Sequence, residues 1–109
     1  TEGSRQIGMG HLTRSLSLAQ ALSLLGAEVL FVVAGDDFAQ SLVESFKFPA
    51  RMVPSLDSLK ELPRGNIAFV DSYLAGQPFY LRVAQSFEKK LYLDDYFRLD
   101  YPEGTILNY

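Results

Sequence analysis

The sequence contains no cysteine, which excludes disulfide bonds and any metal site built on thiolates. This absence is typical of proteins in a reducing compartment, so we expect a cytoplasmic location. Apolar runs long enough to span a membrane are also missing, and no signal peptide is recognisable. We therefore expect no membrane span.

Basic residues are few, with 10 Lys and Arg against 13 Asp and Glu and a formal net charge of −3. No basic cluster exceeds the pair Lys89 and Lys90. Proteins that bind nucleic acids or acidic membranes usually present a basic patch, so the sequence argues against both kinds of partner.

The rest of the composition is that of an ordinary globular domain. The 109 residues are 48% hydrophobic and 21% charged, which predicts one domain with a modest core over residues 1–109. The chain starts at Thr1, within what the pattern indicates is the loop after a strand. We therefore expect that this is a fragment or a processed product and that upstream sequence is missing.

Strand-like apolar runs alternate with helical apolar stripes along the chain. We expect strands over 28–34, 51–53, 67–70, 91–93 and 105–107, after a loop over 1–10. Helices are expected from His11 to a C-cap at Gly26, over 38–46, from an N-cap at Ser55 to Leu62, and from Pro78 to Phe87. This alternation predicts an α/β fold: a Rossmann-like parallel sheet with helices on both faces.

The stretch from Gly8 to Arg14 reads Gly-Met-Gly-His-Leu-Thr-Arg and joins a glycine turn to an apolar helix. Gly8 and Gly10 bracket Met9, so the backbone can take positive φ there and a ligand can come close. The N-terminus of the helix points unpaired N–H groups and its positive dipole end at the turn. The sequence therefore predicts an anion seat.

His11, the only histidine, is expected in the first helical turn, with Arg14 on the same side of the helix. The helix dipole disfavours the imidazolium and favours a neutral ring that can act as a general base, whereas a bound phosphate would act in the opposite direction. A cation in the first turn opposes the dipole, so an anionic ligand would explain Arg14. Alternatively, His11 is a polar surface residue, and Arg14 pairs with Glu2 or Asp36.

Polar residues follow the expected strands, where a parallel sheet gathers its carboxyl ends. The pairs Asp71-Ser72 and Asp94-Asp95 are candidates to orient His11 or to bind sugar hydroxyls. Asp36 and Asp37 are better explained as helix caps. The aromatic side chains of Tyr73, Tyr96 and Tyr109 would either stack on a ligand or pack at the rim. A metal site built from Asp71, Asp94 and Asp95 has suitable ligands but lacks the spacing of any metal motif.

The sequence also resembles a known enzyme family. Residues 6–14, which read Gln-Ile-Gly-Met-Gly-His-Leu-Thr-Arg, resemble the Gly-x-Gly-His-x-x-Arg signature of the UDP-sugar hydrolases of pseudaminic acid biosynthesis, the PseG family. Residues 69–73 resemble its Val-Asp-Ser-Tyr block, and residues 93–95 and 106–108 resemble its Asp-Asp-Leu and Leu-Leu-Asn stretches, although Tyr96 replaces the leucine. These motifs occur in the family's order, and the similarity extends over essentially the whole chain.

The resemblance implies the N-terminal half of a GT-B enzyme similar to MurG, without the nucleotide-binding C-terminal domain. Such a piece is expected to be inactive alone and either weakly stable or self-associating, because a missing central strand leaves unpaired edges. The implied reaction is hydrolysis of a UDP-linked diacetamido-trideoxy sugar to UDP and free sugar, without a cofactor or metal. Alternatives are a MurG-like glycosyltransferase with a UDP-sugar donor and a non-catalytic nucleotide-sugar binding domain.

In the implied hydrolase, His11 is the catalytic base that activates water. The substrate-binding residues would be Gly8, Met9, Gly10, Arg14, Asp71, Tyr73, Asp94, Asp95 and Asn108.

Overall fold

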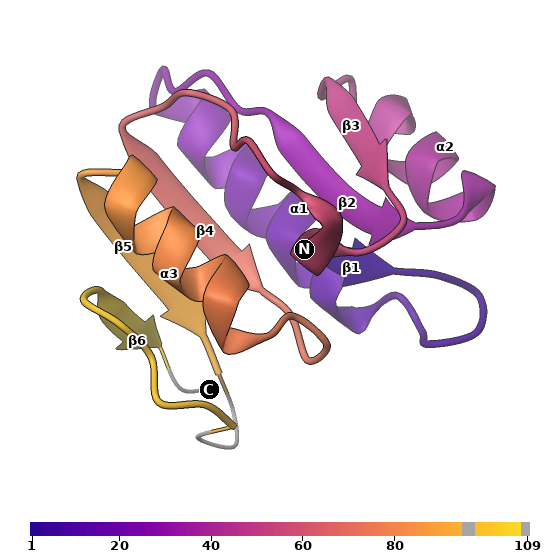
Figure 1. The fold of residues 1–109 in the computed structure, drawn as a ribbon. Helices are drawn as coiled ribbons and strands as arrows, with labels where there is room; N and C mark the ends of the chain where they lie inside the picture. The colour runs from indigo at the N-terminus through magenta and orange to yellow at the C-terminus, as the bar shows by residue number, and fades with distance from the viewer. Residues whose placement is uncertain (95–97, 108–109) are drawn as a thin grey trace. The chain divides into compact units, whose positions relative to one another are not determined.

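The structure is a computed structural model that describes residues 1–94 and 98–107. It is an α/β architecture in which the chain forms two compact units, Thr1–Ser55 and Leu56–Tyr109 (Figure 1). Each unit is built on a parallel three-stranded sheet, with strand order β1-β2-β3 in the first and β4-β5-β6 in the second. The predicted α/β class and parallel pairing are confirmed, with the strands divided between two sheets.

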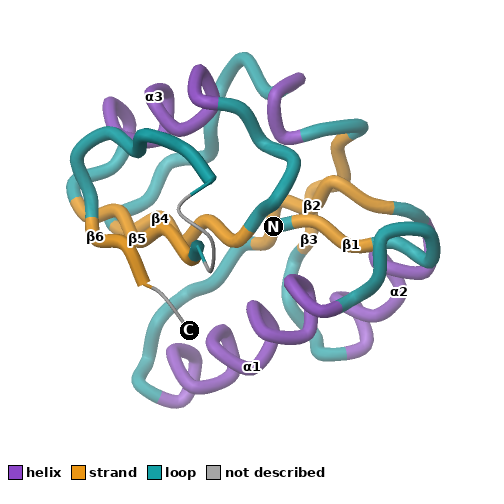
Figure 2. The backbone as a smooth tube through the Cα atoms, turned by 90° about the horizontal axis from the view of Figure 1, so that it is seen from below, coloured by secondary structure: helices purple, strands orange, loops and turns teal. Residues whose placement is uncertain are grey.

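The first unit alternates strands and helices in chain order. Its elements are β1 (Glu2–Gly3), α1 (Gly10–Leu24), β2 (Phe31–Gly35), α2 (Asp37–Ser45) and β3 (Ala50–Val53). Figure 2 shows α1 and α2 on the same side of these strands. Gly26 follows α1 with a φ of +91°, in line with the predicted C-cap region.

The core of the first unit lies between its two helices and β2. The buried side chains come from positions spaced three or four apart on the helices and two apart on the strand. They are Leu12, Leu16 and Ala19 of α1, Phe31 and Val33 of β2, and Ala39 and Val43 of α2. The ring of Phe31 also packs on Phe48, with 5.5 Å between centroids. The helical stripe predicted for α1 is therefore the face that packs on the sheet.

Two boundaries in the first unit differ from the expectation. Residues 1–10 are not all loop, because Glu2 and Gly3 pair in parallel with Ala34 and Gly35. A two-residue strand is thus present ahead of the glycine turn, where the first strand was expected to be missing. Strand β2 begins at Phe31 and not at residue 28.

The second unit begins with the short 3₁₀ helix η1 (Leu56–Ser58), followed by β4 (Ile67–Asp71), α3 (Gln77–Ser86), β5 (Lys89–Leu93) and β6 (Thr105–Leu107). The predicted helix from Ser55 to Leu62 is therefore wrong beyond one turn. Leu56 and Leu59 are both buried, and their spacing of three residues suits the tighter 3₁₀ turn.

Three tyrosines pack together on the α3 side of the second sheet. Tyr80 of α3 meets Tyr92 of β5 edge to face, with 5.2 Å between ring centroids, and Tyr101 at 4.9 Å. Tyr92 and Tyr101 are stacked at 5.6 Å. The Tyr92 hydroxyl donates to the carbonyl oxygen of Glu103 at 3.0 Å. Because side chains alternate along a strand, this cluster shows that Tyr92 and every second residue of β5 face α3.

None of the helices formed by the described residues combines the length and apolar character needed to cross a membrane.

Candidate functional site

The glycine turn is a small closed loop between β1 and α1. Gly8 N donates to the Ser4 carbonyl oxygen at 2.9 Å, and Ser4 N donates to the Gly8 carbonyl oxygen at 3.2 Å. Ile7 N donates to the Ser4 hydroxyl oxygen at 3.1 Å. Gly8 closes this loop with a φ of +90°, so the predicted need for glycine is confirmed at this position.

The N-terminus of α1 lies at the turn and has no side-chain cap. The helix begins at Gly10, and Met9 is its N-cap without a side-chain capping bond; no acidic residue lies in the first turn of this described helix. An added Cβ at Gly8 or Gly10 would meet no described atom within 4 Å. The Met9 side chain packs on the core, so only its backbone remains suitable for the predicted ligand contact.

His11 lies in the first turn of α1, as predicted, and Arg14 lies one turn further on. Both residues are half-buried, and Arg14 Nη2 is 3.4 Å from His11 Nδ1. A guanidinium has only donors, so this contact favours the tautomer in which Nδ1 has the lone pair. The pair therefore places a potential base and a fixed cation beside the open helix N-terminus.

Asp36 joins the glycine loop to the start of α2. Its carboxylate accepts from Ala39 N at 3.0 Å and from Arg5 N at 3.1 Å. The backbone bond from Ala39, followed by that from Arg5, holds the pKa of Asp36 below its usual value. The predicted capping role of Asp36 is confirmed, and the residue also lies at the same sheet edge as the turn.

Arg5 lies beside the candidate site and was not singled out in the sequence analysis. Besides its backbone bond to Asp36, its guanidinium carbon lies 5.1 Å from the centroid of the Phe38 ring, a cation–π contact. Two arginines, Arg5 and Arg14, thus flank the turn in sequence. A search for cations on both sides of Gly8 would have found it.

In the second unit, Asp71 is the last residue of β4 and is only 2% exposed. Ser72 follows it, also buried, and its hydroxyl oxygen accepts from Leu74 N at 3.1 Å and from Ala75 N at 2.9 Å. This turn leads toward α3, and Tyr73 lies half-buried within it. The block that resembles the hydrolase family is therefore a tightly bonded strand end.

Asp94 follows β5 and is 3% exposed. Its carboxylate oxygen Oδ2 accepts from Arg98 N at 2.8 Å and from the Tyr101 hydroxyl at 2.6 Å. Arg98 in turn donates through Nη2 to the Ala75 carbonyl oxygen at 2.7 Å. These bonds give Asp94 a structural role that the sequence analysis did not include.

Asp71 and Asp94 lie at the same edge of the second sheet but on opposite faces. Asp94 is on the α3 side, since its partner Tyr101 packs on Tyr80 and Tyr92. Asp71 pairs in register with Leu93, the neighbour of Tyr92, and strand alternation places it on the other face. The two side chains therefore face different sides of the sheet at that edge.

Two predicted site residues, Asp95 and Asn108, lie outside the described residues, as do Tyr96 and Tyr109. Within residues 1–94 and 98–107, no group of three or more acidic or histidine side chains is arranged to hold a metal ion. The metal alternative built from Asp71, Asp94 and Asp95 stays a hypothesis, because Asp95 lies outside the described residues.

Comparisons with protein-family models, with curated proteins and with solved structures gave no match to this chain. The resemblance to the UDP-sugar hydrolases stays a prediction that depends on the motifs in residues 6–14, 69–73, 93–95 and 106–108.

Proposed function

We propose that this chain forms part of an inverting UDP-sugar hydrolase, similar to the PseG family, in which His11 is the general base. The substrate would be a UDP-linked diacetamido-trideoxy sugar, and the products would be UDP and the free sugar. The observation that supports this proposal best is the contact of 3.4 Å between His11 Nδ1 and Arg14 Nη2 at an uncapped helix N-terminus.

The turn supplies the means to bind a diphosphate. Backbone N–H groups at the start of α1 and the positive end of its dipole favour an anion. Arg14 adds a guanidinium that can pair with phosphate oxygens. The open space over Gly8 and Gly10 leaves room for the ligand to reach the backbone. Charge that develops on the departing diphosphate would be stabilised at this position.

During the reaction, Arg14 would give up its contact with His11 and pair with the diphosphate, while His11 would contact the attacking water. When Arg14 pairs with the diphosphate, the lone pair of His11 Nδ1 becomes available to water. His11 then takes a proton from the water molecule as its oxygen bonds to the anomeric carbon. The bond from that carbon to the diphosphate oxygen breaks, and its electron pair leaves with UDP. Attack from the opposite side inverts the anomeric configuration.

Roles for Asp71, Tyr73 and Asp94 in orienting the sugar are implied by the family resemblance and stay predictions. The same holds for Asp95 and Asn108.

The expectations that the chain is inactive without a nucleotide-binding domain and that it self-associates also remain proposals. Sedimentation analysis of the purified chain tests the last of these.

The test of the base is His11→Ala in a protein that includes the nucleotide-binding domain. General-base catalysis is typically worth about 10²–10⁴-fold, so we expect kcat to fall at least a hundredfold with little change in KM. Gln20→Ala, an exposed change on α1, is the matched control and should leave both constants unchanged. A near-normal kcat for His11→Ala would remove His11 from the mechanism.

Product analysis separates hydrolysis from the two alternatives. Release of free sugar without an added acceptor supports a hydrolase, whereas turnover only with an acceptor sugar supports a glycosyltransferase. Calorimetric binding of the UDP-sugar without any turnover would instead support a binding domain.

A further inference from the structure

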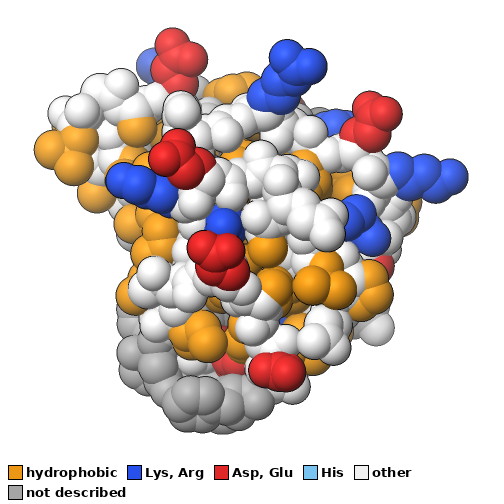
Figure 3. Space-filling model, turned by 60° about the vertical axis from the view of Figure 1, so that its left-hand side comes forward, with side chains coloured by type: hydrophobic (Ala, Val, Ile, Leu, Met, Phe, Trp, Pro, Cys, Tyr) orange, Lys and Arg blue, Asp and Glu red, His pale blue; other side chains and the backbone are white. Residues whose placement is uncertain are grey.

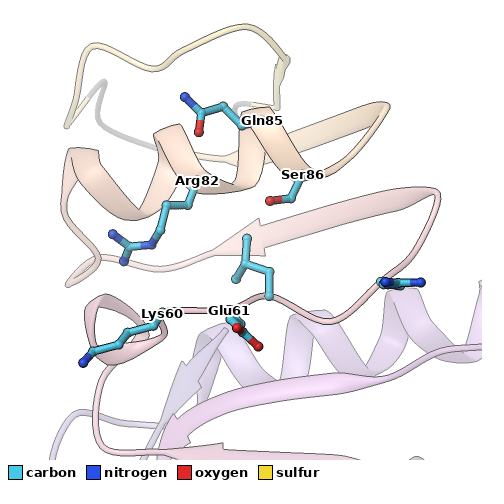
Figure 4. A pocket seen from close by; sticks show the side chains of 7 residues that line it. Lys60, Glu61, Arg82, Gln85 and Ser86 are labelled. Carbon is cyan, nitrogen blue, oxygen red and sulfur yellow. The ribbon is translucent and has the colours of Figure 1, made fainter.

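The second unit has an open groove of about 560 Å³ between α3 and the segment that follows η1. Its lining consists of polar and charged side chains around a single leucine. They are Lys60, Glu61, Leu62, Arg64, Arg82, Gln85 and Ser86. In Figure 4, Arg82 extends from α3 toward the segment that carries Lys60 and Glu61. None of these residues has a role in the proposed hydrolysis.

The groove is positively charged in an acidic chain. Three cations and one carboxylate line it, whereas the whole sequence has a net charge of −3. Figure 3 shows acidic and basic side chains interspersed on one face of the molecule. A concave surface lined mainly by one sign of charge concentrates its field and attracts counter-ions. The groove is therefore suited to an anionic ligand.

Arg82 is anchored but has spare hydrogen-bonding capacity. Its Nη2 donates to the Asp57 carbonyl oxygen at 3.2 Å, which holds the side chain in place. Its Nε is buried and has no hydrogen-bond partner in the described part of the chain. A guanidinium has five N–H donors, so most of them are not used by this one bond. An acceptor with several oxygens would use those on the two Nη atoms, whereas the buried Nε is not accessible to a ligand.

We propose that this groove binds a small phosphate-bearing anion, with Arg82 as the main contact and Lys60 as a second cation. The Arg82 fork matches two phosphate oxygens, and Lys60 contributes a point charge. Gln85 and Ser86 add neutral donors at the end of α3. The groove volume is within the range of about 300–1,000 Å³ that is usual for small-molecule sites.

The experiment is a titration of the whole chain with pyrophosphate, followed by residue-resolved NMR. Because pyrophosphate also suits the turn before α1, binding is read from shifts of Gln85 and Ser86, separately from those of Gly8 and His11. We expect saturable shifts at Gln85 and Ser86. If saturable shifts are absent only at Gln85 and Ser86, the groove proposal is wrong and the proposed hydrolase site is unaffected.

Four variants test the assignment of charges. Arg82→Gln should weaken pyrophosphate binding about tenfold and Lys60→Gln severalfold, whereas Glu61→Gln should strengthen it. Lys89→Gln removes one exposed positive charge outside the groove and is the control, with no change expected. Lys60→Gln and Glu61→Gln alter exposed residues, so they test the proposal even if Arg82→Gln disturbs folding.

A second titration with citrate distinguishes phosphate from carboxylate. Weaker binding of citrate than of pyrophosphate supports the proposal. Tighter binding of citrate, the absence of saturable shifts at Gln85 and Ser86, or an equal effect of Lys89→Gln and Lys60→Gln would each overturn it.

Discussion

The Tyr101 hydroxyl donates a 2.6 Å hydrogen bond to the buried carboxylate of Asp94. Tyr101 lies seven positions after Asp94 in sequence, and the bond ties Tyr101 back to the end of β5. Arg98 strengthens this link, since its backbone N–H donates to the same carboxylate and its side chain reaches the Ala75 carbonyl oxygen. A residue chosen as a sugar-binding candidate is thus also a structural centre of the second unit.

Tyr101→Phe should destabilise the chain by about 1–3 kcal/mol, because a buried acceptor loses a donor. The measurement is urea denaturation followed by circular dichroism. A double-mutant cycle with Asp94→Asn isolates the pairwise energy from other effects of each change. Unchanged stability of Tyr101→Phe would show that the bond contributes nothing net.

The stabilising effect of Tyr101 should disappear at high pH. Burial, and then the hydrogen bond to Asp94, raises the pKa of the Tyr101 hydroxyl above its ordinary value. A raised pKa in the folded state gives stability that is complete below the unfolded pKa of about 10 and is lost as pH rises above it. The difference in unfolding free energy between wild type and Tyr101→Phe should therefore shrink above pH 10. A constant difference from pH 8 to pH 11 would contradict this.

Asp36→Ala should lower the urea midpoint, because α2 loses its N-cap and the glycine loop loses a tether. Asp36→Asn should retain most of the stability, since asparagine caps helices nearly as well. The pKa of Asp36 is lowered in the folded state, so its charge stabilises above the unfolded value of about 3.9 and loses this effect as pH falls. The difference in unfolding free energy between wild type and Asp36→Ala should accordingly be smaller below pH 4 than at neutral pH. A deficit of the same size at pH 3 and pH 7 would argue against an ionic contribution.

Gly35→Ala should be strongly destabilising although alanine is small. The new Cβ would overlap the Gly3 carbonyl oxygen and lie 3.0 Å from the Cβ of Ala39. Overpacking of this kind costs about 1–3 kcal/mol. Gly10→Ala is the control, because no described atom lies within 4 Å of its added Cβ and the residue begins a helix. The melting temperatures of the two variants are compared by thermal unfolding. Equal melting temperatures would contradict the steric explanation.

Much of the fold could be predicted from local pattern. The β-branched and aromatic runs indicated β2, β4 and β5, and β6 occupies the predicted residues 105–107. The two-residue strand β1 could not be found in this way, because Glu2 and Gly3 have no strand-like pattern and pair only through contact with β2. The predicted helix from Ser55 was wrong beyond one turn for a different reason. The spacing of Leu56 and Leu59 fits both an α-helix and a 3₁₀ helix.

The candidate site was predictable where it depended on neighbours in sequence. The positive φ of Gly8, the helical position of His11 and the capping by Asp36 follow from short motifs. The cation–π contact of Arg5 could not be predicted, because it arises when separate segments meet in the folded chain. The partners of Asp94 lie only four and seven positions further along the chain, but no sequence motif indicates them.

One carboxylate serves both the loop before α1 and the first turn of α2, since Asp36 accepts from Arg5 N and from Ala39 N. Fraying at the start of α2 and loosening of the loop that ends at Gly8 are therefore not independent motions. A ligand that steadies one of these segments would slow amide exchange in the other, without any contact of its own there.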